Sequence, residues 1–592
     1  MNPFRTAKRF VFPLLGLWIL LYASFSLLKP PLLDGTDSVT AEAAREMAST
    51  GDWIIPQING VRAPQTPPLL IWMTAVSFRI FGVSDATARL PLALCALALF
   101  ALTLIFGSRL FLTPVAGFYA TLILITSCGV FLFAHLVFPV LLLTLWLTLA
   151  MYCFWRSLRH PTLPNSAAFG AVCALGFLSM GLAGVVLPFG IVVLFLFYSR
   201  NLRHLARWYP AAGIGLFLLI LIPWMTLAYR STPNQSFLAP MHSFAKPPVP
   251  LFWAFVLIWI APWFLFAFAA LSHLSARVFS RDTAFDHVRD HDQHALLLLV
   301  LWAGFILALY TFSSRQEHFA LPALPAIALL AARWLAADEK HPSRAGRIIA
   351  WILFIGGILK GGIMVFLAVG VPAPPPFRVL RPPRPSSGTD IATLLHLHSG
   401  HRLFFGPITD LTIAAMGAFR VPLLIAAAAI AVGVTGNLIF RLKGKIRLAN
   451  CFIAGMMVFF LIAAHLALNT FSPVVSSAIL AEAIKPEVAA GDVIVINGPY
   501  EDASALPFYL ERQVKLLSRR PDALAPWSYA PDAPPIFLDN GALAALWTSD
   551  TRVWVWTPVT TPPSLPGESY VIARTGGREV LSNQPNQGGA SF

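Results

Sequence analysis

The sequence contains few charged residues and few cysteines. Of its 592 residues, 12% are charged and 57% are hydrophobic, whereas a soluble domain carries about 25% charged residues. This deficit excludes a single soluble core and predicts long apolar membrane segments. The five cysteines all lie in apolar runs, outside any CxxC or CxxH motif. We therefore predict that they are small packing residues rather than disulfides or metal ligands.

Several other functional signatures are also missing. No glycine-rich phosphate loop follows a strand and no metal-ligand cluster is visible, so we expect no cofactor and no metal. The net charge of +15 comes from basic residues in short loops between apolar runs, which is a membrane-topology pattern and argues against nucleic-acid binding. Arg5, Lys8 and Arg9 precede an apolar run without a small-residue cleavage site, so we predict a retained first helix.

About thirteen apolar runs are predicted to cross a membrane, because a spanning helix needs about 20 apolar residues. They fall at 10–28, 90–108, 114–132, 134–155, 166–183, 184–199, 210–228, 250–272, 294–312, 318–336, 348–370, 420–440 and 450–468. Loops after the even-numbered runs are basic, which is typical of cytoplasmic loops. We therefore predict an α-helical polytopic protein of the bacterial inner membrane. Its N-terminus would be cytoplasmic and its C-terminal tail, after an odd number of spans, periplasmic.

The tail of the chain has a different pattern, in which strand-like runs alternate with helical stretches. The strand-like runs are Asp492–Asn497, Arg512–Leu517, Pro535–Leu538, Arg552–Trp556 and Ser569–Ala573, and the helical stretches include Ser477–Ala490 and Gly541–Trp547. This alternation predicts a small α/β domain. We therefore divide the chain into a transmembrane domain, 1–468, and a C-terminal periplasmic α/β domain, 469–592.

The first external loop, residues 29–89, contains two predicted helices. Ser38–Ser49 has a helical pattern with Glu42 and Arg45 on one side, and Leu69–Phe81 is apolar but too short to span. Both segments are typical of helices that lie along the membrane surface. For Glu42 and Arg45, a solvated helix face is the alternative to a binding role.

Two aspartates, Asp34 and Asp37, follow the first predicted span at the outer interface. Acidic groups at this depth are uncommon and often functional. A helix cap is the alternative role for Asp37, because aspartate is a preferred N-cap residue. The residues alone leave both roles open.

The stretch Leu32–Trp72, LLDGTDSVTAEAAREMASTGDWIIPQINGVRAPQTPPLLIW, resembles the first periplasmic loop of a family of bacterial membrane glycosyltransferases. These are the protein O-mannosyltransferase-like enzymes that include the lipid A aminoarabinose transferases. Phe81–Pro91 continues the match, and Ser313–Ala326 provides a second one. Leu506–Arg512 and Ile536–Asp539 resemble the soluble domain of one branch of the family. The resemblance therefore covers nearly the whole chain.

This resemblance implies a GT-C fold and a defined kind of chemistry. Such enzymes take a sugar from a polyprenyl-phosphate donor and pass it to a lipid or glycan acceptor on the periplasmic side. A carboxylate accepts the proton of the acceptor oxygen, and basic residues hold the departing lipid phosphate. No further cofactor is needed, because the activated bond is already on the lipid.

Several positions depart from the family's usual motifs. The family reads D-P-D-E in the first loop, with the second aspartate catalytic. When the loops are aligned on Ala41-Glu42, Thr36 stands at that position, Asp37 stands at the glutamate, and Asp34 matches the earlier aspartate. Threonine cannot supply a carboxylate. A shift of one residue makes Asp37 the proposed base, with Asp34 as the reserve candidate.

Three more substitutions remove charges that the family usually carries. Thr66 replaces the lysine of an E-K-P-P motif, Val140 replaces an acidic residue after a proline, and Met180 replaces the lysine of a T-K-G motif. Threonine, valine and methionine supply no charge. The remaining candidates for substrate binding are Arg62, Glu42, Arg45, His242, Arg315, Glu317 and His318.

Three functional hypotheses follow. The first is a glycosyltransferase, acting as a monomer, with Asp37 as base and Arg62 and Arg315 on the phosphate. The second is a degenerate, non-catalytic relative that binds a lipid-linked sugar or a partner protein. The third is a transporter or flippase, which lacks support because the chain has no matching halves and few intramembrane charges.

Overall fold

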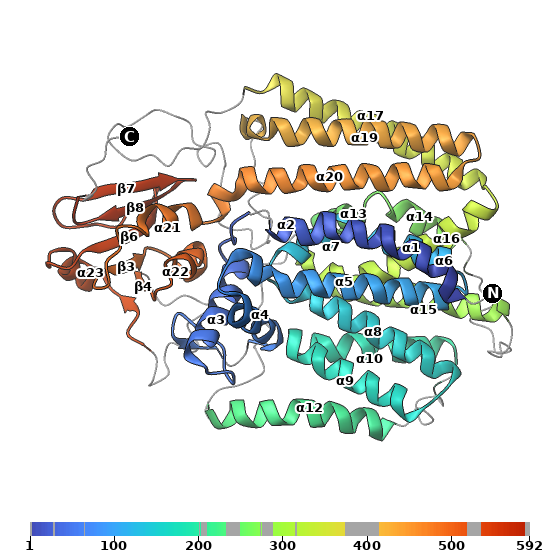
Figure 1. Ribbon diagram of the computed structural model, residues 1–592, viewed down its shortest axis with the longest axis horizontal. Helices are drawn as coiled ribbons and strands as arrows, with labels where there is room; N and C mark the ends of the chain where they lie inside the picture. Colours follow the sequence, from blue (N-terminus) through green and yellow to red (C-terminus); the bar gives the residue numbers. More distant parts are fainter. Residues whose placement is uncertain are drawn as a thin grey trace.

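The computed structural model describes residues 3–27, 30–63, 66–200, 202, 210–231, 249–272, 274, 288–313, 316–372, 414–517 and 534–585. Figure 1 shows a bundle of roughly aligned helices with a small α/β region at one end. The N-terminus lies at the opposite end of the bundle, and the helices α3 and α4 lie between the bundle and the α/β region.

The bundle is built from long apolar helices. Its first half contains α1 (Pro3–Trp18), η1 (Ile19–Ala23), α2 (Ser24–Leu27), α5 (Asp85–Leu110), α6 (Pro114–Ile125), α7 (Cys128–His135), α8 (Val140–Arg159), α9 (Leu163–Met180) and α10 (Ala183–Tyr198). Its second half contains α12 (Pro210–Ser231), α13 (Val249–Ile260), α14 (Phe264–Leu271), α15 (Val288–Phe312), η3 (Glu317–Ala323), α16 (Leu324–Lys340), α17 (Arg344–Gly370), η5 (Ala414–Phe419), α19 (Arg420–Leu442) and α20 (Ile446–Val475).

Within the described ranges, nine helices are long and apolar enough to cross a membrane, or up to eleven if each of two bent helix pairs is one span. This confirms a polytopic membrane protein. The predicted spans at 10–28 and 184–199 correspond to the shorter apolar helices Phe10–Ala23 and Ala183–Tyr198. The count of thirteen requires both of these to cross, and it stays a prediction.

The predicted single span at 250–272 is broken in the structure. Helices α13 and α14 meet at an angle of 100°. Pro262 lies in the break, where it has no amide hydrogen to donate and disfavours a helical conformation at the residue before it. A hydropathy profile detects the apolar residues of this segment but not the change in direction.

The first loop contains both predicted helices. They are α3 (Thr36–Thr50) and α4 (Leu69–Phe81), and the short antiparallel strands β1 (Gln57–Ile58) and β2 (Val61–Arg62) lie between them. α3 begins directly after Gly35, whose φ of 91° suits glycine. α4 is apolar and only 13 residues long, so it is too short to cross a bilayer. Its position along the membrane surface stays a prediction.

The C-terminal region contains one six-stranded sheet. Its strands are β3 (Val493–Ile496), β4 (Lys515–Leu517), β5 (Phe537–Leu538), β6 (Val553–Pro558), β7 (Tyr570–Thr575) and β8 (Arg578–Ser582), and their order is β5-β4-β3-β6-β8-β7. The first four in this order are parallel, and β8 is antiparallel to both of its neighbours. The helical elements are α21 (Ala478–Ile484), η6 (Tyr500–Ala503), α22 (Ala505–Leu510) and α23 (Asn540–Trp547).

All five predicted strands are present, which confirms the α/β character of this region. The prediction missed β8, which pairs with β7 across a turn at Gly576 and Gly577. The predicted helix Ser477–Ala490 is wrong in its length, because α21 ends at Ile484. Lys485 precedes Pro486, and a residue before proline is disfavoured in a helix.

A buried ion pair joins three helices at the bundle end that lies away from the sheet. Arg441 donates to the carboxylate of Asp338, and its other terminal nitrogen donates to the Asn450 side-chain oxygen over 2.7 Å. Asp338 also accepts from the Ser343 amide over 2.8 Å. Both charged side chains are 1% exposed. A buried charge pair requires such additional hydrogen bonds to offset its desolvation.

Candidate functional site

Asp37 lies in the first turn of α3, and its carboxylate is enclosed. Oδ1 accepts from the Val137 amide over 2.6 Å, and Oδ2 accepts from the Leu33 amide over 3.0 Å. The side chain is 0% exposed. Burial raises the pKa of the Asp37 carboxyl, while Arg89 and the two amides oppose that rise. A carboxyl with a raised pKa is a better proton acceptor than an ordinary aspartate.

Arg89 is the cation next to Asp37, with Nη2 3.6 Å from Oδ2. It lies near the start of α5 and is almost fully buried. Nε donates to the His135 carbonyl over 2.8 Å, and Nη1 and Nη2 donate to the Pro30 and Pro31 carbonyls over 2.7 and 3.2 Å. Arg89 therefore links the end of the first span to α5 and α7. A guanidinium suits this role because its donors form a rigid fork.

The turn between α7 and α8 contacts two sets of predicted site residues. On one side the Val137 amide donates to Asp37. On the other side the Phe138 ring packs edge-on against His318, with ring centroids 4.7 Å apart. Glu317, next to His318 in η3, is 0% exposed, and its carbonyl accepts from Trp259 over 3.2 Å. The structure therefore places Asp37, Glu317 and His318 around one turn.

Asp34 faces the C-terminal region instead. Oδ1 accepts from the Ala505 amide over 2.8 Å, and Oδ2 accepts from the Ser477 hydroxyl over 2.8 Å and from Arg578 over 2.6 Å. Burial raises the pKa of the Asp34 carboxyl and Arg578 lowers it. These contacts are those of a residue that joins the first loop to the tail. Asp37 therefore remains the first candidate for the base.

Further hydrogen bonds join the first loop to the tail. Tyr509 accepts from the Leu32 amide and donates to Asp85, each over 2.8 Å. Ser504 accepts from the Gly35 amide over 2.8 Å. The first loop and the tail therefore form one packed unit at the same end of the bundle (Figure 1).

Glu42, Arg45 and Glu46 lie on the face of α3 that the tail covers. Arg45 donates to both oxygens of Glu42, over 2.7 and 2.6 Å. Glu42 is fully buried and Arg45 is 14% exposed, so the solvated-face interpretation is wrong; the sequence could not show that α22 packs on this helix. Glu46 accepts from the Gly60 amide. Burial, and then the Glu42 carboxylate, raise the pKa of Glu46 to about 7.

The remaining predicted residues are more dispersed. Arg62, on β2, donates to the Ser231 carbonyl at the end of α12 over 3.5 Å. Val140 begins α8 and is fully buried, and Met180 ends α9. Arg315 and His242 lie outside the described residues. Among the described residues, no group of three or more His, Cys, Asp or Glu side chains could hold a metal ion.

Comparisons with known proteins find similarity to membrane glycosyltransferases. The family described as dolichyl-phosphate-mannose–protein mannosyltransferase matches residues 65–226. The undecaprenyl phosphate-α-4-amino-4-deoxy-L-arabinose arabinosyl transferase of Aeromonas salmonicida is 27% identical over 379 residues, covering 60% of this chain and 65% of that protein. The enzyme of the same name from Shewanella sediminis is 28% identical over 316 residues, covering 49% and 53%.

The structural comparison decides the fold. The crystal structure of ArnT from Cupriavidus metallidurans bound to undecaprenyl phosphate matches with a TM-score of 0.77 at 20% identity, over 99% of both chains. The chain has the GT-C fold of ArnT. The apo form of ArnT matches with a TM-score of 0.76. The predicted resemblance to the aminoarabinose transferases is therefore confirmed, and the ArnT-like fold includes the C-terminal region as well as the bundle.

Sequence reasoning missed Arg89, Ser477 and Arg578 as partners of the two aspartates. One signal for Arg89 was available, because it is a lone arginine near the start of a 26-residue apolar helix and such charges are rare and commonly functional. No local signal marks Arg578 or Ser477. Their roles depend on how the tail packs against the first loop.

Proposed function

We propose that this protein transfers a sugar from a polyprenyl-phosphate donor to a lipid or glycan acceptor at the periplasmic face of the membrane, acting as a monomer. The observation that carries the proposal is the buried Asp37 carboxylate at the head of the first loop, in a chain with the fold of ArnT. The identity of 27% with arabinosyl transferases supports the same reaction class.

In the proposed reaction, an acceptor hydroxyl attacks the anomeric carbon of the donor sugar. The bond between that carbon and the phosphate oxygen breaks, and polyprenyl phosphate leaves with the bonding electrons. The hydroxyl proton passes to the Asp37 carboxylate as the new glycosidic bond forms. Each carboxylate oxygen can accept two hydrogen bonds, so Oδ1, which accepts from Val137, retains capacity for this proton.

The enclosure of Asp37 adds a condition to this mechanism. Its side chain is 0% exposed, so a segment that covers it must move to admit the acceptor, and we propose that this segment is the turn between α7 and α8. Lids and loops that complete a site on substrate binding are common among enzymes. The movement would break the hydrogen bond from Val137 and leave the Arg89 pair in place.

Arg62 is the proposed phosphate contact among the described residues, and Arg315 is proposed as a second. The Arg62 guanidinium is partly buried on β2, and a guanidinium binds phosphate oxygens in a bidentate way. Arg89 is a poorer candidate, because its donors already serve three carbonyls and Asp37. Glu42, Arg45, Glu317, His318 and His242 are proposed to contact the sugar or the acceptor.

The proposed orientation places the first loop and the domain 469–592 in the periplasm and the N-terminus in the cytoplasm of a bacterial inner-membrane protein. The contacts of Asp34 and Leu32 with the tail support a common side for both segments. The basic loops between the spans support a cytoplasmic N-terminus.

The test is transfer of radiolabelled sugar in proteoliposomes. The first donor to try is the undecaprenyl-phosphate-linked 4-amino-4-deoxy-L-arabinose for which the curated relatives are named. Asp37→Asn is expected to lose at least about 100-fold in rate, because asparagine cannot take the proton. The matched control is Asp550→Asn, which removes an exposed tail carboxylate. Full activity of the Asp37→Asn protein would refute the assignment of the base.

A non-catalytic role is the second candidate, and the enclosure of both aspartates favours it. Backbone amides and Arg89 surround Asp37, and Arg578, Ser477 and the Ala505 amide surround Asp34. This role predicts that the wild type binds undecaprenyl phosphate but forms no product from any of several lipid-linked sugars. Measuring lipid binding and product in the same proteoliposomes separates the two candidates.

A further inference from the structure

A second polar region lies at the bundle end away from the first loop and the sheet. It is a cavity of about 460 Å³ between the end of α5, the end of α8 and the start of α9. Its polar lining consists of Arg109, Tyr152, Arg156, His160, Thr162 and Asn165. None of the described residues that line this cavity is a carboxylate.

Two guanidinium groups converge on one aromatic ring in this cavity. The guanidinium carbons of Arg109 and Arg156 lie 5.6 and 6.0 Å from the centroid of the Tyr152 ring. Arg109 also donates to the Tyr152 hydroxyl, which can still donate one hydrogen bond of its own. The two cations that lie near this one ring repel each other, and an anion that contacts both would relieve the repulsion.

The surroundings of the cavity add to its positive potential. Thr162 precedes α9 and makes no side-chain cap hydrogen bond, and the positive end of the α9 helix dipole favours an anion. Beside the cavity, Arg333 lies over the Phe111 ring and forms an ion pair of 2.9 Å with Asp292. That carboxylate is therefore already paired with its own cation.

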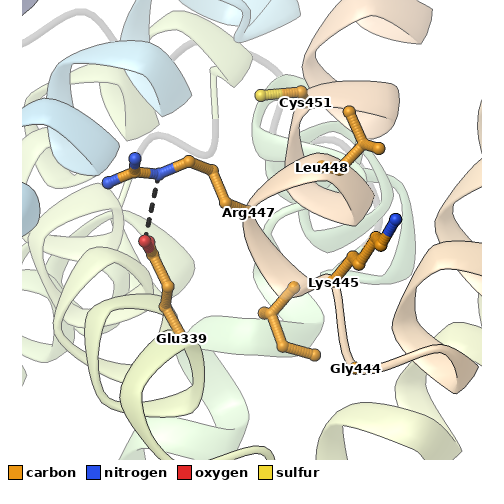
Figure 2. Close-up of a pocket in the computed structure, with 7 residues that line it drawn as sticks. Glu339, Gly444, Lys445, Arg447, Leu448 and Cys451 are labelled. Atoms are coloured by element: carbon orange, nitrogen blue, oxygen red, sulfur yellow. Dashed lines mark ion pairs between the residues drawn. The ribbon is translucent and has the colours of Figure 1, made fainter.

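Another cavity, lined by the loop between α19 and α20, contains a carboxylate. Figure 2 shows this hollow of about 430 Å³, in which Arg447 points toward Glu339. Nε of Arg447 lies 3.0 Å from the Glu339 carboxylate. Glu339 therefore balances the charge of Arg447, and Lys445 is a further, exposed cation in the same lining.

We propose that the cavity between Arg109 and Arg156 binds a phosphate group, as a phosphate monoester or diester. Arg109 and Arg156 would each donate to the phosphate oxygens, and Tyr152 and Asn165 would complete the ring of donors. Charge-assisted hydrogen bonds of this kind are the strong ones in proteins. This site is separate from the site of the proposed transfer reaction, and neither proposal depends on the other.

The apolar side chains at the rim of the cavity matter for whether the phosphate belongs to a lipid or is a free ion. Leu112, at the lip of the cavity, is 59% exposed, and Leu163 at the start of α9 is 58% exposed. Both adjoin the ends of helices long enough to span the membrane. A lipid headgroup would place its phosphate in the cavity and its acyl chains against these side chains. A free phosphate ion would use the arginines alone.

The test uses the full-length protein in nanodiscs and in detergent. Binding of phosphatidylglycerol, phosphatidylcholine and inorganic phosphate is measured for the wild type and for Arg109→Gln/Arg156→Gln. The expected loss of affinity for the preferred probe in the double variant is tenfold or more, since hydrogen bonds to charged groups are among the strongest in proteins. Lys443→Gln/Lys445→Gln is the matched control, because it removes two exposed positive charges from the loop between α19 and α20.

The outcomes are distinct. Preference for phosphatidylglycerol over phosphatidylcholine, lost only in the arginine variant, supports a lipid source. Binding of inorganic phosphate with the same dependence on the arginines supports the site with a soluble anion. Equal binding by the arginine variant and the lysine control overturns the proposal. Arg156→Gln alone repeats the comparison without risk to folding, because Arg156 is exposed.

Discussion

Arg578 of strand β8 and Asp34 of the first loop form an ion pair, with Nη1 2.6 Å from Oδ2, although 544 positions separate them in the sequence. The side chains are 18% and 5% exposed, so the pair is partly shielded from water. The pair joins β8, which is the last strand in the sequence, to the segment that carries the proposed base. The tail therefore contributes directly to the position of the first loop.

Arg578→Gln and Asp34→Asn are each expected to lower the stability of the folded protein by about 1–3 kcal/mol, because each leaves a buried partner unpaired. The double variant should lose less than the sum of the two, since the residues share one interaction. Thermal unfolding in detergent measures all three. Lys485→Gln, which breaks the exposed pair with Glu511, is the control and should cost less than about 1 kcal/mol. Additive losses would contradict the coupling.

Arg89→Lys is expected to reduce transfer by at least about 100-fold, because a small misplacement of a catalytic group can have an effect of that size. Lysine keeps the charge but cannot reach the three carbonyls that the guanidinium serves. The loss should appear in kcat more than in KM, since Arg89 positions the base. Arg79→Lys on α4, at an exposed arginine, is the control and should retain activity within about twofold. Equal losses in both variants would argue against a positioning role.

Glu46 predicts a pH dependence of stability. Its pKa is raised from 4.5 to about 7 in the folded protein, so the folded state holds a proton that the unfolded state has already released. The resulting stabilisation is complete below about pH 4.5 and is lost as the pH rises through about 7; it amounts to at most about 3 kcal/mol. Stability should therefore fall between pH 5 and pH 8.

Glu46→Gln is expected to flatten this profile and to be more stable than the wild type at pH 8. Glutamine keeps an acceptor for the Gly60 amide but never carries a charge beside Glu42. Burial raises the pKa of Asp34 and Asp37 as well, so the informative quantity is the difference between variant and wild type. Unfolding of Glu482→Gln, an exposed substitution on α21, should follow the wild-type profile. An unchanged profile for Glu46→Gln would refute the assignment.

Arg441→Met is expected to destabilise the bundle by about 3–5 kcal/mol, because it leaves the buried Asp338 carboxylate unpaired. Arg441→Met/Asp338→Leu should recover most of the loss, since an apolar pair removes both charges. Arg447→Gln is the control, because Arg447 is 55% exposed in its pair with Glu339. Unfolding temperatures in detergent compare the three. A double variant as unstable as the single one would show that Arg441 acts through other contacts.

Hydropathy predicted the bundle because membrane helices are defined by local composition. It placed α17 and α19 within about four residues of their bounds in the structure. It could not predict the bend between α13 and α14, since an apolar run does not encode direction. Alternation predicted five strands, whereas β8 was missed because Arg578–Ser582 is short and begins with two charged residues.

The sequence predicted those site residues that belong to a continuous motif, but not the residues that contact them from distant segments. The resemblance of the first loop selected Asp34, Asp37 and Glu42. Asp37 and Glu42 are buried in the structure, and the Asp34 side chain is 5% exposed. The motif could not predict which residues contact these side chains, because the contacting residues come from α5, from the turn after α7 and from the tail. The charge on Glu46 depends on packing under η6 and α22, which no local pattern reveals.

The positions of the chain ends restrict how the α13–α14 bend can be interpreted. α1 begins at one end of the bundle and the six-stranded sheet lies at the other (Figure 1). A chain whose ends lie on opposite faces of a bilayer must cross it an odd number of times. If α13 and α14 formed a hairpin that entered and left the membrane on the same face, the number of crossings would become even. One other segment would then also have to be reassigned as crossing or not crossing. Reassignments of crossing segments in this fold therefore come in pairs.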